Sequence, residues 1–211
     1  MFYRAARLAF RAVAALVFGF RVEGAHRLPR SGPAVVVAPH RSWLDPACVG
    51  AAARRPVRFL MIDRVYEKPW ARWFYRRMGA VPVRPGGRAA LRTALRLLEG
   101  GEVVGVFPEG RVVRSTTAAR VHPGAALLAV RVGAPVVPME ITGSARAWPP
   151  GSRWPRPARV RVHVGEAIDP GPAGARLSVE EMLDRIEASL RAGSAPERHD
   201  ARPSGAGTGV L

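Results

Sequence analysis

The sequence predicts an α/β fold, in which helices flank a mostly parallel central sheet and an N-terminal amphipathic helix associates with a membrane. Short runs rich in valine alternate along the chain with longer segments whose apolar residues recur at helical spacing. Such alternation is typical of parallel sheets, because each crossover between parallel strands needs a dozen or more residues, usually a helix. The first residues combine arginines with an apolar run, which indicates a helix at a membrane surface.

The N-terminal segment, residues 1–22, is expected to form this interfacial helix. Its apolar run, residues 12–20, is shorter than the roughly 20 residues that a membrane-spanning helix needs. Arg4, Arg7 and Arg11 share one helical face, from which arginines can bind anionic lipid headgroups. The alternative is an ordinary amphipathic helix packed on its own domain.

Residues 23–191 are expected to form one domain, because a chain of 211 residues suits a single hydrophobic core. In its first half, β-branched apolar runs bounded by proline or glycine predict strands at 34–38, 57–62, 80–83 and 103–107. Helices are expected between them, from the first strand to about residue 53, at 66–78 and at 88–99. The last of these has leucines at helical spacing and ends at Gly100-Gly101.

The second half continues the alternation. A helix is expected at 123–132, which starts with proline, followed by strands at 135–141 and at 158–164, where arginine alternates with valine. Between these strands, residues 144–157 are rich in proline and tryptophan and predict a loop that faces the substrate or the membrane. A final helix starts at Ser178, which forms a capping box with Glu181. Residues 192–211 have the composition of a disordered tail.

Charge narrows the possible partners. The formal net charge of +17 calls for an anionic partner, which is a lipid surface, a phosphorylated ligand or a nucleic acid. Basic residues interleaved with aromatic residues on one face, or a known nucleic-acid-binding module, are not found, so we expect no nucleic-acid partner. The lone cysteine, Cys48, excludes a disulfide framework within the chain and fits a reducing compartment.

A histidine and an aspartate follow the predicted strand at 34–38. His40 and Asp45 are five residues apart, a spacing that on one regular helix would put them on different faces. His40 is therefore expected in the turn that leaves the strand and Asp45 at the start of the next helix, where Pro46 is favoured. A neutral histidine can take the proton of an attacking hydroxyl, and a carboxylate on its other nitrogen fixes the tautomer. The alternative functions are a helix cap for Asp45 and a hydrogen-bonded loop residue for His40.

Three further motifs lie downstream. The strand at 103–107 runs into Phe107-Pro108-Glu109-Gly110, a turn at the edge where open α/β sheets bind ligands. Upstream of it, Gly79 precedes Arg84 at the end of another strand, and downstream a strand contains Val137-Pro138.

In this order, the motifs resemble the four sequence blocks of the glycerol-phosphate and lysophosphatidic acid acyltransferase family, also described as PlsC-like with an HX4D motif. The resemblance covers about residues 24–170. It implies an enzyme of phospholipid biosynthesis that transfers a fatty acyl group from acyl-CoA or acyl-carrier protein to the hydroxyl of lysophosphatidic acid. It implies His40 as the base, Asp45 as the residue that orients it, and a phosphate-binding region at Arg84, Glu109 and Gly110. A carboxylate repels phosphate, so we expect Glu109 to hold an arginine or the loop.

The chain also departs from the family pattern. Pro39 stands where the family usually has asparagine, and the third block continues Arg111-Val112-Val113-Arg114 rather than with Thr-Arg-Ser. Arg111 or Arg114 is the candidate to replace the missing arginine. The departures leave the acceptor open, so another lysolipid such as a lyso-ornithine lipid is the alternative substrate, and a non-catalytic module that binds anionic lipid is the alternative class.

The remaining expectations concern cofactors and location. No cluster has metal-ligand spacing, and we expect neither a metal nor a cofactor beyond the acyl-CoA or acyl-carrier protein co-substrate. No Gly-x-Ser-x-Gly elbow is present, so a covalent acyl-enzyme is not expected. The partners are then the lysophospholipid, the acyl donor and an anionic membrane surface. The expected location is the cytoplasmic face of the cell membrane, as a peripheral or monotopic protein.

Overall fold

The computed structural model describes residues 2–62, 66, 67, 69–83, 87–109 and 122–193. Within these residues, seven strands form a single sheet in the order β1-β7-β6-β2-β5-β3-β4, and the adjacent pairs are parallel except for β6 and β7. The strands are β1 (Arg21–Glu23), β2 (Ala34–Val37), β3 (Val57–Ile62), β4 (Val81–Val83), β5 (Val103–Val106), β6 (Val136–Thr142) and β7 (Arg161–Val164). The predicted α/β class with a mostly parallel sheet is confirmed.

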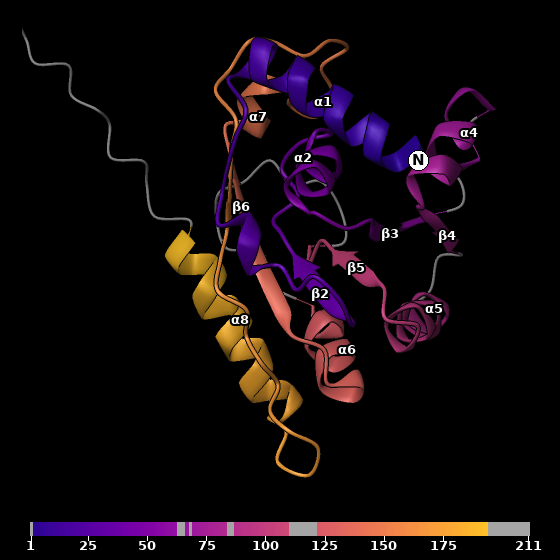
Figure 1. The fold of residues 1–211 in the computed structure, drawn as a ribbon, viewed down its shortest axis with the longest axis vertical. Helices are drawn as coiled ribbons and strands as arrows, with labels where there is room; N and C mark the ends of the chain where they lie inside the picture. The colour runs from indigo at the N-terminus through magenta and orange to yellow at the C-terminus, as the bar shows by residue number, and fades with distance from the viewer. Residues whose placement is uncertain (1, 63–65, 68, 84–86, 110–121, 194–211) are drawn as a thin grey trace, which may run out of the picture.

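Helices cover both faces of the sheet (Figure 1). On one face lies α2 (Asp45–Ala52), and α1 (Phe2–Phe18) packs across α2 and α4 (Pro69–Met78). On the other face lie α5 (Gly87–Glu99), α6 (Gly124–Val132) and α8 (Val179–Gly193). A 3₁₀ turn (Ala25–Arg27) follows β1, and α7 (Ser144–Ala147) follows β6.

Each face of the sheet has its own hydrophobic core. The core under α2 includes Val36, Val49 and Val162, while the core under α5, α6 and α8 includes Val35, Leu98 and Ile186. Neighbouring residues of β2 therefore contribute to opposite cores, as the alternation of side chains along a strand requires. Because β2 is buried on both faces, its sequence is a continuous apolar run rather than an alternating one.

The structure differs from the sequence prediction at several boundaries. The three-residue strand β1 was not predicted, because so short a segment has no detectable period. The strand expected at 158–164 begins at Arg161, and the loop expected at 144–157 begins with the short helix α7. Helix α8 starts at the predicted capping box of Ser178 and Glu181 and continues to Gly193, so residues 192 and 193 belong to it. The rest of the expected tail lies outside the described residues.

Helix α1 is oriented opposite to the expectation for its arginines. Arg7 Nε and Arg11 Nη1 both donate to the carbonyl oxygen of Ala51, at 3.2 and 3.1 Å. Two of the three arginines therefore bind the last turn of α2, where cations are favoured by the helix dipole, and do not project outward. Ala14 and Phe18 are buried, so the helix also contributes to the core.

No helix in the described part of the chain combines the length and the apolar character that crossing a bilayer requires. The division of the chain at residue 22 stays a prediction.

Candidate active site

The candidate site lies at the carboxyl edge of the sheet. β2 pairs with β5 on one side and with β6 on the other, and all three strands are parallel. The segments that leave their carboxyl ends therefore meet at one edge, where open α/β sheets place their ligand sites. These segments carry His40 after β2, Glu109 after β5 and Ser144 after β6.

Asp45 stabilises the turn that carries His40. It is the first residue of α2, as predicted, and Pro46 follows in the first helical turn. Its side chain is fully buried, and Oδ2 accepts hydrogen bonds from the backbone N–H groups of Arg41 at 2.6 Å and Ser42 at 2.7 Å. The carboxylate thus caps the preceding turn rather than the amides of its own helix, and its position is fixed by the backbone.

The same oxygen contacts the histidine. Asp45 Oδ2 lies 3.2 Å from His40 Nδ1, and the His40 side chain keeps 14 % of its surface exposed. An ionised carboxylate can only accept hydrogen bonds, so Nδ1 carries the proton and Nε2 of the neutral ring is left as an acceptor. This geometry gives His40 the tautomer that a general base needs.

Aromatic rings hold the imidazole from its face. The Phe107 ring stacks on His40 with centroids 4.2 Å apart and planes at 21°, and Phe59 stacks on Phe107 at 5.3 Å and 8°. Phe59 comes from β3 and Phe107 from the end of β5, so three rings form one column beside the sheet. Gly105 makes room for it, because a Cβ atom at that position would collide with the Phe59 ring.

Glu109 fixes the backbone at His40. Its Oε2 accepts a hydrogen bond from the His40 backbone N–H at 3.3 Å. Burial raises the pKa of the Glu109 carboxyl, and the hydrogen bonds from backbone N–H groups oppose this shift only in part. The expectation that Glu109 holds a loop agrees with this contact, and the loop it holds is the one that carries the histidine.

Ser42 joins the same turn to the segment after β6. Its buried hydroxyl donates to the carbonyl oxygen of Trp148 at 2.7 Å and accepts from the Leu44 N–H at 3.1 Å. The Trp148 indole in turn donates to the carbonyl oxygen of Ser152 at 3.0 Å. The turn between His40 and Asp45 is therefore held by the segment after β6 and, through Glu109, by the segment after β5.

Of the predicted site residues, the structure brings together His40, Asp45 and Glu109. The other four, Arg84, Gly110, Arg111 and Arg114, lie outside the described residues. Sequence reasoning assigned no role to Phe107 or Ser42. The signals available for them were the Phe-Pro-Glu-Gly motif and the place of Ser42 inside the His40–Asp45 turn, but neither shows a contact.

Two observations bear on other chemistries. Within the described residues, no group of three or more histidine, cysteine, aspartate or glutamate side chains has the arrangement of a metal site. Cys48 is buried beneath the site, and burial, with a smaller contribution from nearby Asp45, raises the pKa of its thiol. A buried thiol of this kind is a poor nucleophile at neutral pH, because the thiolate is the reactive form.

The fold and this geometry define an α/β protein whose histidine–carboxylate pair, at the carboxyl edge of a parallel sheet, is built for proton transfer. Residues 19–142 match the family model described as Acyltransferase, and the chain belongs to that family.

Similar proteins include two 1-acyl-sn-glycerol-3-phosphate acyltransferases. The one from Bacillus subtilis is 23 % identical over 189 residues, covering 88 % of this chain and 92 % of the relative. The chloroplastic LPAT1 of Arabidopsis thaliana is 29 % identical over 178 residues, covering 79 % of this chain, which spans 50 % of the plant relative. The crystal structure of the 1-acyl-sn-glycerophosphate (LPA) acyltransferase PlsC from Thermotoga maritima superposes with a TM-score of 0.77 and 27 % identity, over 90 % of this chain and 78 % of that one.

Proposed function

We propose that this protein is a 1-acyl-sn-glycerol-3-phosphate acyltransferase, which moves a fatty acyl group from a thioester donor to lysophosphatidic acid and forms phosphatidic acid. The observation that carries the proposal is the 3.2 Å contact between His40 Nδ1 and Asp45 Oδ2 in a chain of the Acyltransferase family. The activity for which the Bacillus, Arabidopsis and Thermotoga relatives are named supports the choice of acceptor. The donor is acyl-CoA or acyl-carrier protein.

His40 acts as the general base in this mechanism. Its Nε2 takes the proton of the acceptor hydroxyl as the oxygen attacks the thioester carbonyl carbon. The imidazolium that forms is stabilised by the Asp45 carboxylate at Nδ1 and lies against the Phe107 ring face, and aromatic faces attract cations. When the tetrahedral intermediate collapses, the C–S bond breaks, and the departing thiolate takes up the proton from Nε2. The products are the ester and the free thiol.

Recognition of the acceptor needs cations for its phosphate. We assign this role to Arg84, Arg111 and Arg114, because forked guanidinium groups bind phosphate oxygens, and we place Gly110 in the same phosphate-binding region. Glu109 serves as a positioning residue through its bond to the His40 backbone.

The outer surface of α1 favours binding of the protein to a membrane. Leu8, Val13 and Leu16 are 62 %, 58 % and 87 % exposed, whereas Arg7 and Arg11 turn toward α2. A helix on a water-exposed surface normally buries its apolar side chains and exposes its charged ones, and α1 does the opposite. A contiguous exposed apolar face favours contact with a lipid surface. We propose that the protein binds the cytoplasmic face of the cell membrane, peripherally or monotopically. The single buried cysteine agrees with a reducing compartment.

The proposal is tested with purified protein, a radiolabelled acyl-CoA and a panel of lysolipid acceptors. We expect transfer to lysophosphatidic acid, and loss of transfer in a His40→Gln variant that still binds vesicles. Turnover that survives in this variant would defeat the assignment of the base. A clear preference for another lysolipid, such as a lyso-ornithine lipid, would replace the acceptor and leave the chemistry in place.

A further inference from the structure

Three arginines gather beside the end of α1. Arg21, Arg159 and Arg161, together with Gly19, line a surface hollow of about 180 Å³. Gly19 has a left-handed backbone (φ 52°) that turns the chain from α1 toward β1. Two backbone hydrogen bonds then fix the arrangement: Val160 N–H donates to the Phe18 carbonyl at 2.9 Å, and Arg21 N–H donates to the Val160 carbonyl at 3.1 Å.

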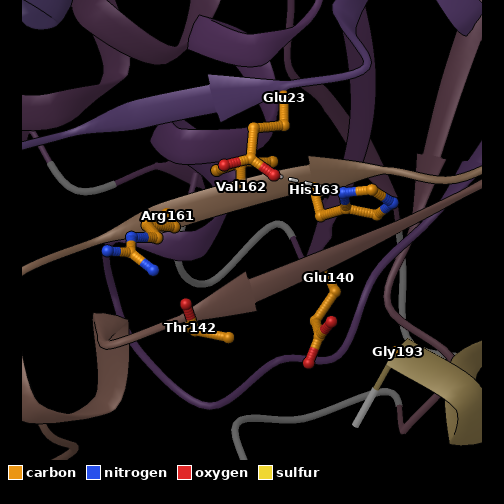
Figure 2. Close-up of a pocket in the computed structure, with 7 residues that line it drawn as sticks. All are labelled: Glu23, Glu140, Thr142, Arg161, Val162, His163 and Gly193. Atoms are coloured by element: carbon orange, nitrogen blue, oxygen red, sulfur yellow. Dashed lines mark ion pairs between the residues drawn. The ribbon is translucent and has the colours of Figure 1, made fainter. Parts of the chain in front are cut away.

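Among the described residues, no carboxylate forms an ion pair with these arginines, and Glu23 and Glu140 line a separate, adjacent hollow with Arg161. Arg21 and Arg161 face each other across the parallel pair β1 and β7, and all three side chains are exposed. In the next hollow along the sheet, Glu23 pairs with His163 at 3.7 Å, and Figure 2 shows the Arg161 guanidinium pointing away from this pair. Three like charges held at one place repel each other, so the hollow is electrostatically suited to an anion.

The hollow lies at the same edge of the sheet as the candidate active site. β6 is antiparallel to β7, and Arg161 pairs with Thr142 at the carboxyl end of β6. Since β6 runs parallel to β2, the start of β7 and the carboxyl end of β2, which leads to His40, lie at one edge. At a strand spacing of about 4.8 Å, β7 is about 10 Å from the histidine-bearing strand β2, measured across the sheet. Along the strands, Arg161 is level with Thr142, which lies beyond Pro138, the partner of Val37 at the end of β2.

The surroundings of the hollow point to a lipid rather than a soluble anion. It begins where α1 ends, and the outward side of α1 is apolar. The segment that leads into Arg159 carries Trp154, which is 74 % exposed, and in Figure 1 this segment runs beside the carboxyl end of α1. A tryptophan and arginines beside an apolar surface are the residues found at the headgroup level of a bilayer.

We infer that Arg21, Arg159 and Arg161 form a binding site for the phosphate of an anionic phospholipid in the membrane. The inference rests on the proposed membrane association. A lipid held there turns the carboxyl edge of the sheet, and with it His40, toward the bilayer that contains the acceptor. Arginine suits this role because its planar fork donates two hydrogen bonds to phosphate oxygens.

Vesicle binding of the full chain tests the site. Binding to phosphatidylcholine vesicles is compared with binding to equimolar phosphatidylglycerol and phosphatidylcholine vesicles, for the wild type and for the variant Arg21→Gln/Arg159→Gln/Arg161→Gln. The variant is expected to lose about a hundredfold of the preference for anionic vesicles, because each arginine near such a surface contributes to binding. Its binding to phosphatidylcholine alone should stay close to that of the wild type, since α1 is intact.

A matched control removes the same charge elsewhere. Arg88, Arg92 and Arg96 are exposed along α5, on the far side of the sheet from α1. Their triple glutamine variant should keep most of the preference for anionic vesicles. An equal loss in both variants would overturn the site in favour of general attraction by net charge.

Two further experiments distinguish a membrane lipid from free phosphate and from the acceptor as the ligand of this site. Inorganic phosphate at the concentration of the lipid phosphate should not displace the protein from anionic vesicles, and displacement would overturn a lipid site. Acyl transfer to detergent-dispersed lysophosphatidic acid should have an unchanged KM in the Arg21→Gln/Arg159→Gln/Arg161→Gln variant, and a raised KM would assign the arginines to the acceptor instead. Because vesicle binding needs no turnover, it can fail while the proposed enzymatic activity stands, and the reverse also holds.

Discussion

Asp45 Oδ2 accepts a hydrogen bond from His40 Nδ1 at 3.2 Å while the same oxygen accepts two backbone N–H groups at 2.6 and 2.7 Å. The carboxylate is therefore held by the chain itself before any substrate binds. The imidazole depends on it for its tautomer, which makes the pair a preorganised unit.

The variant Asp45→Asn tests this dependence. Because Oδ2 accepts all three hydrogen bonds, an amide oxygen in its place keeps an acceptor for Nδ1, but the negative charge that stabilises the imidazolium is lost. We expect kcat to fall about a thousandfold with the fold preserved. Steady-state kinetics with circular dichroism measures both, and activity within a few-fold of the wild type would rule out stabilisation of the imidazolium by Asp45.

Glu109 should make stability depend on pH. Burial raises the pKa of its carboxyl above the ordinary 4.5, so the folded state favours the protonated form. The stability that this proton provides is present below pH 4.5 and is lost as the pH rises through the raised pKa. The variant Glu109→Gln lacks this titration, so the unfolding free energy of the wild type relative to the variant should decrease across that window.

Urea unfolding at a series of pH values measures this difference. The matched control is Glu99→Gln, at an exposed position on α5, which should show no such trend. A difference between wild type and Glu109→Gln that stays constant with pH would contradict the prediction.

The ring of Phe107, stacked between His40 and Phe59, should affect kcat more than KM. The Phe107 ring stacks on the imidazole face, so Phe107→Leu should loosen His40. We expect kcat to fall about tenfold to a hundredfold with little change in KM. Phe107→Tyr keeps the ring and should restore most of kcat. A variant in which KM alone rises would place Phe107 in substrate binding.

Gly105 should be intolerant of a methyl group. The added Cβ in Gly105→Ala would collide with the Phe59 ring and approach Val57. Overpacking of this kind costs about 1–3 kcal/mol of unfolding free energy. The double variant with Phe59→Leu should recover part of that loss, and chemical denaturation of the three variants measures it. Additive destabilisation in the double variant would mean that the rings do not conflict.

The outer face of α1 should control membrane affinity. Leu8 and Leu16 are exposed, so Leu8→Ser/Leu16→Ser should leave the melting temperature unchanged. Each leucine transferred into lipid is worth up to about 1.5–3 kcal/mol, so binding to phosphatidylcholine vesicles should weaken about tenfold or more. The variant Ala5→Ser/Ala9→Ser, on the same face, should have a smaller effect. Unchanged vesicle binding in the leucine variant would argue against membrane contact through this helix.

The fold could be predicted well where the signal is local. The valine run that forms β2 and the leucine spacing of α5 are each contained in one segment, so their periodicity is visible without the rest of the chain. β1 could not be found in this way, because three residues become a strand only by pairing with β7, from which they are separated by most of the chain. The antiparallel direction of β7 relative to β6 could not be predicted for the same reason.

The candidate site could likewise be predicted from the sequence only in part. The order of the motifs and the place of His40 and Asp45 follow from the sequence alone, since a turn followed by a helix is a local matter. Tertiary structure was needed to show that Phe107 covers the imidazole, that Arg7 and Arg11 bind α2 while the apolar side of α1 faces outward, and that Arg21 meets Arg161. These contacts join residues far apart in the chain, and their geometry follows from the packing of the sheet and its helices rather than from any local preference.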